Sequence, residues 1–321
     1  FKHYVCLFLV MPMKSVFTVI LMFVFCVSLS AQIKSGFGPG KPIFETEPYF
    51  INPLVFFDID TLSPRLDIFI EVPRSNILFS KKSGKYSAAF EISLSLLDGN
   101  GSVVFQKSGE ESYSFGENEI IKERDKSEFY VYNHFLSPGE YSLESVLKDK
   151  NSKKESRKTV AVKVKNYSAA PITLSDIMLV SELTAGPDGT KEMTPLISNN
   201  VFGYENFYLF FEIYNNTESP KSGVFTYRII DRSDNAVSEG VFDYALNERK
   251  TSVFQKIFIG DVFRELFAPE NMDPEEMSKK GFGVFKLTLT DKASQTVVTE
   301  KRFTMLPEKP LMPQMHPGFK E

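Results

Sequence analysis

The stretch Phe90–Phe105 reads FEISLSLLDGNGSVVF and contains the strongest fold signal in the chain. Residues 90, 92, 94 and 96 are apolar and alternate with polar residues, which is typical of a β-strand with one buried face. The DGNG segment at residues 98–101 favours a tight turn, because hairpin turns need positive φ angles that Gly and Asn adopt readily. The apolar residues at 103–105 are the expected return strand. This stretch therefore predicts an antiparallel hairpin.

The same alternation of apolar and polar residues recurs on both sides of this hairpin. Each alternating segment is short and is followed by a turn signal, as in an antiparallel β-sandwich. A polar, Pro-terminated break at residues 166–171 separates two such groups of strands. The further expected strands are Arg65–Val72, Gly139–Leu147, Thr159–Lys165, Ile172–Leu183, Phe207–Ile213, Val224–Ile230 and Thr296–Met305.

Two of the expected hairpins share one pattern. Gly139 begins an alternating run that ends in Asp149-Lys150-x-Ser152, and Gly281 begins one that ends in Asp291-Lys292-x-Ser294. This internal agreement indicates two tandem copies of one module. The sequence thus predicts an all-β chain with two tandem immunoglobulin-like antiparallel β-sandwiches, interrupted by one short helix from Asp273 to Gly281.

The N-terminal region carries the features of a secretory signal peptide. Met13 and Lys14 precede an apolar run over Val16–Val27, and small residues follow up to Ala31. The run is shorter than the roughly 18 residues that a membrane-spanning helix needs. We therefore expect cleavage before Gln32, no transmembrane anchor afterwards, and export to the periplasm, the outer envelope or the medium.

These signals divide the chain into five parts. Residues 1–31 are upstream residues and the signal peptide, and residues 32–48 form a Gly- and Pro-containing leader. The first sandwich is expected at residues 49–166 and the second at residues 167–305. Residues 306–321 contain repeated prolines and are expected to form a linker or tail that continues beyond Glu321.

Composition excludes several classes of function. Cys6 and Cys26 both precede the expected cleavage site, so the mature chain can form no disulfide and no thiolate metal site. The formal net charge is −4 before cleavage, which argues against a nucleic-acid partner. The chain has 31 Phe and no Trp, and this Phe-rich composition suits half-buried strands.

Several short segments carry a family resemblance. The chain resembles the N-terminal β-sandwich region of bacterial GWxTD domain-containing proteins over about residues 45–305, although the Gly-Trp-x-Thr-Asp motif itself is absent. The resemblance implies an envelope location and a β-sandwich architecture, with a C-terminal domain to follow. It implies no catalytic or ligand-binding residue. The segments that carry it are Leu66–Pro73, Ile77–Phe79, Leu136–Tyr141, Leu174–Ile177 and Tyr208–Asn215.

The candidate residues for chemistry are few. His134 precedes a Pro-Gly turn and is expected to be a strand-end residue rather than a ligand or base, since no second histidine lies nearby. Asp58 and Asp60 share a strand face, but calcium needs six to eight oxygen ligands and no third acid follows. No catalytic motif is recognisable. The sequence therefore predicts a protein that is not an enzyme, with no cofactor and no metal site.

Aromatic residues provide the remaining candidate surface. Tyr208, Phe210 and Tyr214 lie on the strand face opposite the expected core, where polar residues are usual. They are expected either to pack against the neighbouring module or to bind a partner, and we favour packing. The predicted function is a structural or protein-interaction role with a protein partner. The alternative is a carbohydrate-binding module or an accessory region of a secreted hydrolase.

Overall fold

The computed structural model describes residues 47–186, 191–217, 219–230, 234, 236–258, 284–291 and 296–305. These residues form an almost exclusively β structure, as the alternating sequence predicted. The N-terminal strands are β1 (Phe50–Asp58), β2 (Ser63–Pro73), β3 (Ser80–Lys82), β4 (Lys85–Leu97), β5 (Val103–Gly116), β6 (Ser127–Phe135), β7 (Gly139–Asp149) and β8 (Glu155–Val164). The C-terminal strands are β9 (Ile172–Leu174), β10 (Met178–Ala185), β11 (Lys191–Pro195), β12 (Asn206–Asn215), β13 (Lys221–Ile230), β14 (Ala236–Leu246), β15 (Lys250–Phe258), β16 (Val284–Asp291) and β17 (Thr296–Thr304).

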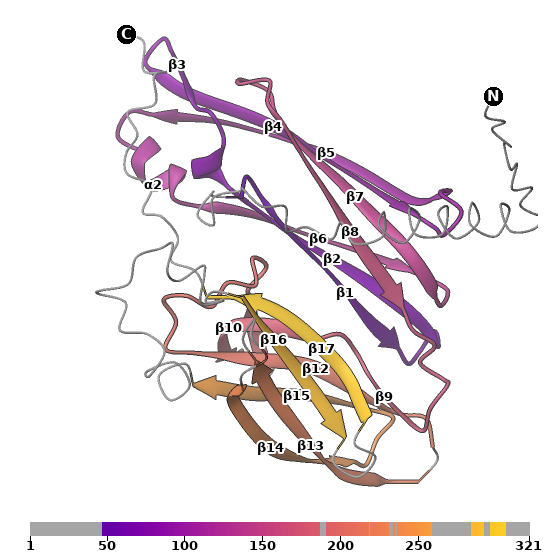
Figure 1. Cartoon of the computed structure of the whole chain (residues 1–321). Helices are drawn as coiled ribbons and strands as arrows, with labels where there is room; N and C mark the ends of the chain where they lie inside the picture. The colour runs from indigo at the N-terminus through magenta and orange to yellow at the C-terminus, as the bar shows by residue number, and fades with distance from the viewer. Residues whose placement is uncertain are drawn as a thin grey trace, which may run out of the picture. The chain divides into compact units, whose positions relative to one another are not determined.

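The strands form four antiparallel sheets, two from each half of the described chain (Figure 1). In the N-terminal half, the sheet β1-β2-β6 is accompanied by a sheet of β4, β7 and β8, in which β3 and β5 also pair with β4. In the C-terminal half, the sheet β11-β10-β12-β15, to which β9 adds, is accompanied by β14-β13-β16-β17. If the short strands β3, β9 and β11 are left aside, the two halves have the same strand order. The N-terminal half consists of the sheets β1-β2-β6 and β5-β4-β7-β8. The C-terminal half consists of the sheets β10-β12-β15 and β14-β13-β16-β17.

The two strands that carry the repeated sequence pattern occupy equivalent places. β7 lies between β4 and β8, and β16 lies between β13 and β17. At the start of β7, the hydroxyl of Tyr141 donates to the carbonyl oxygen of Ser137 at 2.9 Å. A tyrosine that bonds back to the backbone at this corner is typical of immunoglobulin-like sandwiches.

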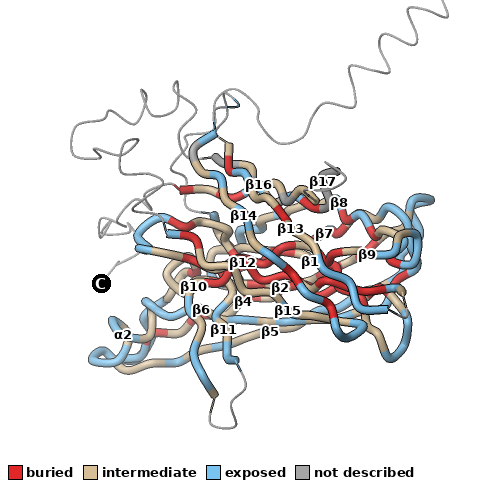
Figure 2. The backbone as a smooth tube through the Cα atoms, turned by 90° about the horizontal axis from the view of Figure 1, so that it is seen from below, coloured by how far each residue is buried: buried red, intermediate tan, exposed pale blue. Residues whose placement is uncertain are grey.

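Each half has its own apolar core, and the buried positions run along the strands (Figure 2). The N-terminal core joins β2 residues such as Ile68 to β4 residues such as Phe90. The C-terminal core joins Phe211 of β12 to Phe225 of β13. The described residues include no cysteine, so burial of large aliphatic and aromatic side chains, each worth about 1.5–3 kcal/mol, is their main source of stability.

The hairpin predicted at residues 98–101 is confirmed. Asp98 accepts hydrogen bonds at its Oδ1 from the backbone N–H groups of Asn100 and Ser102, both at 2.9 Å. Gly101 has φ of +82°, the left-handed conformation for which glycine is suited. The hairpin from β7 to β8 is likewise present and is organised by Asp149, which accepts from the N–H of Asn151 at 2.8 Å.

Helical structure is scarce among the described residues. A short helix, α2 (Ile120–Arg124), and a 3-10 turn, η1 (Arg74–Asn76), connect strands of the N-terminal half. Neither was expected, because each is too short to show a helical period. The helix expected from Asp273 to Gly281, the signal peptide and the residues after 305 lie outside the described residues. Among the described residues, no helix is long and apolar enough to cross a membrane.

Candidate functional site at the junction of the two halves

The free edge of β1 is bonded to the C-terminal half of the chain. The carboxylate Oδ2 of Asp176 accepts from the Val55 N–H at 2.8 Å, and the Asp176 N–H donates to the Val55 carbonyl oxygen at 3.0 Å. The Tyr167 hydroxyl donates to the same carbonyl at 2.9 Å. Two residues along, the Phe57 N–H donates to the hydroxyl of Tyr214 at 2.8 Å. Side chains thus take the place of a further strand.

The alternation of an antiparallel ladder explains which groups need these partners. Residues of β1 direct their backbone alternately toward β2 and toward the free edge. Pro53, Val55 and Phe57 face the free edge, and Pro53 has no N–H to satisfy. An unpaired edge is a template for unwanted pairing, and a proline together with side-chain partners removes that hazard.

Three aromatic rings pack around these hydrogen bonds. Phe57 stacks on Tyr167 with ring centroids 5.3 Å apart, and Tyr214 meets both rings edge-on at 5.6 and 5.5 Å. The Tyr214 hydroxyl donates to Glu212 at 2.6 Å, and Lys250 forms an ion pair with Glu212 at 3.1 Å. Burial raises the pKa values of Tyr167 and Tyr214, so both hydroxyls stay protonated as donors.

A set of largely desolvated charges lies beside the rings. Burial is the main cause that raises the pKa of Asp176, and it lowers the pKa of Lys165. Burial also lowers the pKa of Lys301 to about 8, although the negative charge of Asp176 opposes that shift. The ammonium group of Lys301 donates to the side-chain oxygen of Asn52 in β1 at 2.9 Å. These charges come from both halves of the chain.

An apolar cluster lies between the outer faces of β1-β2 and of β10-β12-β15. Its buried members are Leu54 and Phe56 from β1, Met178 and Val180 from β10, and Phe210 from β12. The ring of Phe210 lies 6.0 Å from Phe56 and 4.9 Å from Phe254 of β15. The outer faces of both sheets are therefore covered where they meet.

The three aromatic residues singled out in the sequence all belong to this junction. Phe210 is 6% exposed and Tyr214 is 1% exposed, while Tyr208 is half-buried and packs against the apolar cluster. Sequence reasoning missed Asp176, Lys165 and Lys301. The sequence signal at Asp176 is an acidic residue between the apolar residues Leu174 and Ile177. The structure explains this pattern, because the Asp176 carboxylate accepts a hydrogen bond from the backbone N–H of Val55.

The other candidates have local structural roles. Asp58 Oδ1 accepts from the N–H groups of Asp60 and Thr61 at 3.0 and 2.8 Å, which shapes the turn between β1 and β2. His134 lies on β6 with its ring 5.0 Å from that of Phe105. Within the described part of the chain, no three His, Cys, Asp or Glu side chains are grouped so that they could hold a metal ion.

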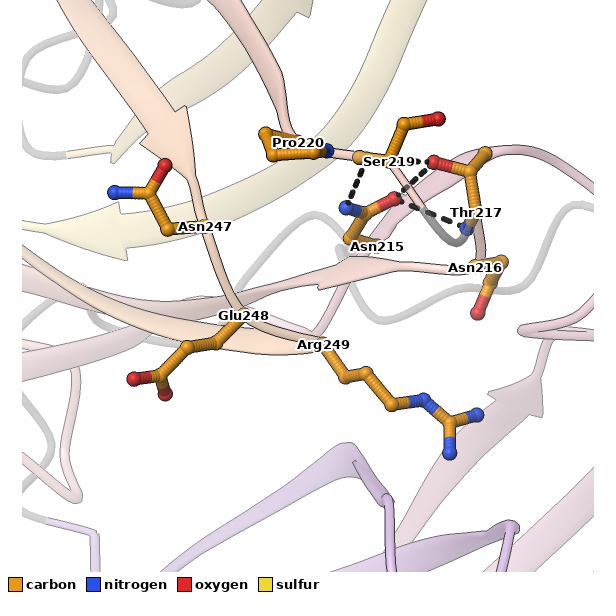
Figure 3. A pocket seen from close by; sticks show the side chains of 8 residues that line it. All are labelled: Asn215, Asn216, Thr217, Ser219, Pro220, Asn247, Glu248 and Arg249. Carbon is orange, nitrogen blue, oxygen red and sulfur yellow. Dashed lines mark hydrogen bonds between the residues drawn. The ribbon is translucent and has the colours of Figure 1, made fainter.

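A surface pocket of about 520 Å³ lies where β12 turns into β13, beside the turn between β14 and β15 (Figure 3). The amide of Asn215 donates to the Ser219 carbonyl at 3.0 Å, and its oxygen accepts from the Thr217 hydroxyl at 2.7 Å. Asn216 donates to the carbonyls of Tyr167 and Ala170. These amides hold the turn together, and we assign no ligand to this pocket.

A second pocket, of about 310 Å³, combines aromatic and polar side chains. Phe129, Phe202 and Tyr204 line it with 59%, 39% and 40% of their surfaces exposed. Hydroxyl and amide groups from Ser181, Thr194, Ser198 and Asn200 also line it, together with Glu71. Pockets that bind small molecules are commonly lined by aromatic side chains together with a few polar groups.

No family model matches the chain, and no curated protein matches it. Among solved structures, the transglutaminase of red sea bream is similar with 11% identity and a TM-score of 0.25, over 82% of this chain and 31% of that chain. A glycosyl hydrolase family 2 member from Bacteroides cellulosilyticus shares 11% identity at a TM-score of 0.28, over 75% and 28% of the two chains. A β-glucuronidase 2 from Bacteroides uniformis shares 10% identity at a TM-score of 0.24, over 78% and 27%. The chain spans less than a third of each of these proteins, and likenesses this weak carry no argument about function.

Proposed function

We propose that this chain is a non-catalytic protein of the bacterial envelope or of the secreted fraction, with a structural or protein-interaction role. Its two halves are tandem immunoglobulin-like modules, and the signal-like segment before Gln32 directs export. The resemblance to the N-terminal region of GWxTD domain-containing proteins supports the same location. A protein partner or a C-terminal domain is the expected neighbour.

The junction is the observation that carries this proposal. Several of its ionisable groups have shifted pKa values, among them Asp176 and Tyr214, and the polar atoms of these two bond to other parts of the same chain. Asp176 and Tyr214 serve as acceptors for backbone N–H groups of β1. Groups that are already saturated in this way fix two modules against each other, whereas a catalytic site keeps some of its polar groups aimed at a substrate.

Calorimetry tests this proposal. Two modules joined by a buried apolar cluster and backbone hydrogen bonds should unfold in one transition, with equal calorimetric and van't Hoff enthalpies. Two separate transitions in the wild-type protein would contradict a rigid structural unit. The non-catalytic assignment would be contradicted if the purified protein hydrolysed a polysaccharide and a single substitution in one of its sandwiches abolished that activity.

The pocket lined by Phe129, Phe202 and Tyr204 favours a second candidate function, carbohydrate binding as an accessory region. A panel of soluble polysaccharides in affinity electrophoresis tests it. Retardation of the wild-type protein that is lost in both Phe202→Ala and Tyr204→Ala would establish this alternative. Equal mobility of the wild type and both variants with every polysaccharide would leave the interaction role as the supported one.

A further inference from the structure

Among the edge strands of more than three residues in the described structure, β6 differs from the others. Charged side chains occur within the edge strands β5, β8, β11, β14, β15 and β17, for example Lys107, Lys158 and Lys256. Such charges discourage edge-to-edge pairing. The β1 edge is closed by the C-terminal half. In β6, the sequence SEFYVYNHF has one carboxylate, Glu128 near its start, and that group is bonded to Arg74 at 2.7 Å.

The ladder alternation fixes which backbone groups of β6 face outward. Val55 faces the free edge of β1, so Leu54 and Phe56 bond to β2 at Asp67 and Arg65. The even-numbered residues of β2 then bond to β6, where their partners are also even-numbered. Phe129, Val131, Asn133 and Phe135 therefore direct their N–H and C=O groups away from the sheet. The described residues contribute no backbone hydrogen bond to these four groups.

The same residues expose an apolar row on the outer face of the sheet. Phe129, Val131 and Phe135 are 59%, 56% and 46% exposed. Val131 lies opposite Phe69, which packs against the apolar cluster of the junction. The row therefore continues a surface that is already buried inside the molecule. At its end, Phe129 lines the pocket of about 310 Å³.

We propose that β6 pairs antiparallel with β6 of a second copy of this chain and joins the two β1-β2-β6 sheets into one. Phe129 and Phe135 lie three residues to either side of Tyr132, and Val131 and Asn133 lie between them. Antiparallel pairing about Tyr132 sets Phe129 of one copy opposite Phe135 of the other. A two-fold interface needs such self-complementarity, and no like charges meet across it. This inference rests on the proposed interaction role and names its partner.

Sedimentation equilibrium of the full chain over a concentration series tests the proposal. The wild-type protein should associate to a dimer, and Val131→Lys should weaken the association by roughly tenfold or more, since it would place a charge in the middle of the paired edge, between Phe129 and Phe135 of the exposed row. Val241→Lys is the matched control, because Val241 is 62% exposed on the edge strand β14. It should associate like the wild type. A second variant, Val131→Pro, removes one outward N–H without removing a ladder bond and should also be monomeric.

Hydrogen exchange separates strand pairing from other modes of association. The amides of Phe129, Val131, Asn133 and Phe135 should exchange more slowly at high protein concentration than at low concentration. A wild-type monomer at all concentrations, a dimer unaffected by both Val131 variants, or a dimer without this protection would overturn the proposal. The calorimetric result distinguishes the two hypotheses, because a single unfolding transition in a strict monomer contradicts the dimer and leaves the proposed function intact.

Discussion

At the scale of single residues, the junction depends on side chains that replace backbone partners. Tyr214 accepts from Phe57 through the hydroxyl that donates to Glu212, and Asp176 bonds both backbone groups of Val55. Each such residue satisfies a polar group that would otherwise be buried without a partner. The loss of one partner leaves the other unsatisfied, which is more costly than the net value of the bond.

Tyr214→Phe should destabilise the protein by about 1–3 kcal/mol, because the Phe57 N–H would lose its acceptor while the rings stay packed. Urea unfolding followed by circular dichroism measures this change. Tyr208→Phe on the same strand is the control and should shift the free energy of unfolding by less than about 0.5 kcal/mol. Equal effects of the two substitutions would show that the Tyr214 hydroxyl has no special role.

Lys301 should make stability rise with pH. Its pKa is lowered to about 8 in the folded protein from an ordinary 10.5, so the unfolded chain holds more protons on this lysine between those values. The free energy of unfolding should therefore increase from about pH 8 to about pH 9.5. The lowered pKa of Lys165 acts in the same direction, and tyrosines with raised pKa values oppose it only near and above their ordinary value of 10. Urea unfolding at several pH values measures the slope.

Lys301→Met is the matched variant for this pH dependence. It keeps most of the apolar stem and removes the titrating group, so the rise in stability above about pH 8 should be smaller than in the wild type. An unchanged slope in Lys301→Met would assign the pH dependence to other groups.

At the scale of elements, the alternation of apolar and polar residues determines where strands form, and the turn residues determine where they end. Gly101 shows that a single turn residue can matter for a hairpin. Its φ of +82° is unfavourable for a residue with a Cβ, so Gly101→Ala should cost about 1 kcal/mol or more. Gly99→Ala in the same turn is the control, since its nearest contact for a Cβ is an ordinary 3.8 Å from Glu140. Thermal melting compares the two variants. A larger loss in Gly99→Ala would contradict the assignment of strain to residue 101.

Strands with one buried face were predictable from the sequence. Strand β1, which is buried on both faces, and the very short helical turns were not. β4 alternates because only one of its faces is in the core. β1 has four consecutive apolar residues, Leu54–Phe57, because one face packs in the N-terminal core and the other in the junction. Such a run shows no period of two. The short α2 and η1 also lack any period, and their existence depends on the strands that they connect.

At the scale of the whole molecule, the sequence pointed to the aromatic candidates and favoured their packing against the neighbouring module, but it did not point to the charged groups beside them. Tyr208, Phe210 and Tyr214 were recognisable as apolar residues on a face that should be polar. Asp176, Lys165 and Lys301 come from separate elements, and no spacing along the chain relates them. Only the packing of the two halves brings them together, and that packing has no signature in a single sequence.

Phe210→Ser tests the junction as a whole. Removal of this buried ring should lower the free energy of unfolding by about 3–5 kcal/mol and split the calorimetric transition in two, because the apolar cluster would lose its centre. Phe258→Ser is the control on the same face of the same sheet, where Phe258 is 52% exposed. It should change stability by about 0.5 kcal/mol or less. A single, barely shifted transition in Phe210→Ser would show that the ring does not couple the halves.

The residues that close the β1 edge are synthesised later than β1 itself. β1 is the first described strand to be made, but its partners Asp176 and Tyr214 follow Val55 and Phe57 by 121 and 157 residues. At ribosomal speeds of about 5–20 residues per second, synthesis of these partners follows roughly six to thirty seconds later. During that interval Leu54 and Phe56 are uncovered and the edge is open. A chaperone that binds the N-terminal half before the C-terminal half is made would therefore cover the exposed apolar residues and the open edge of β1.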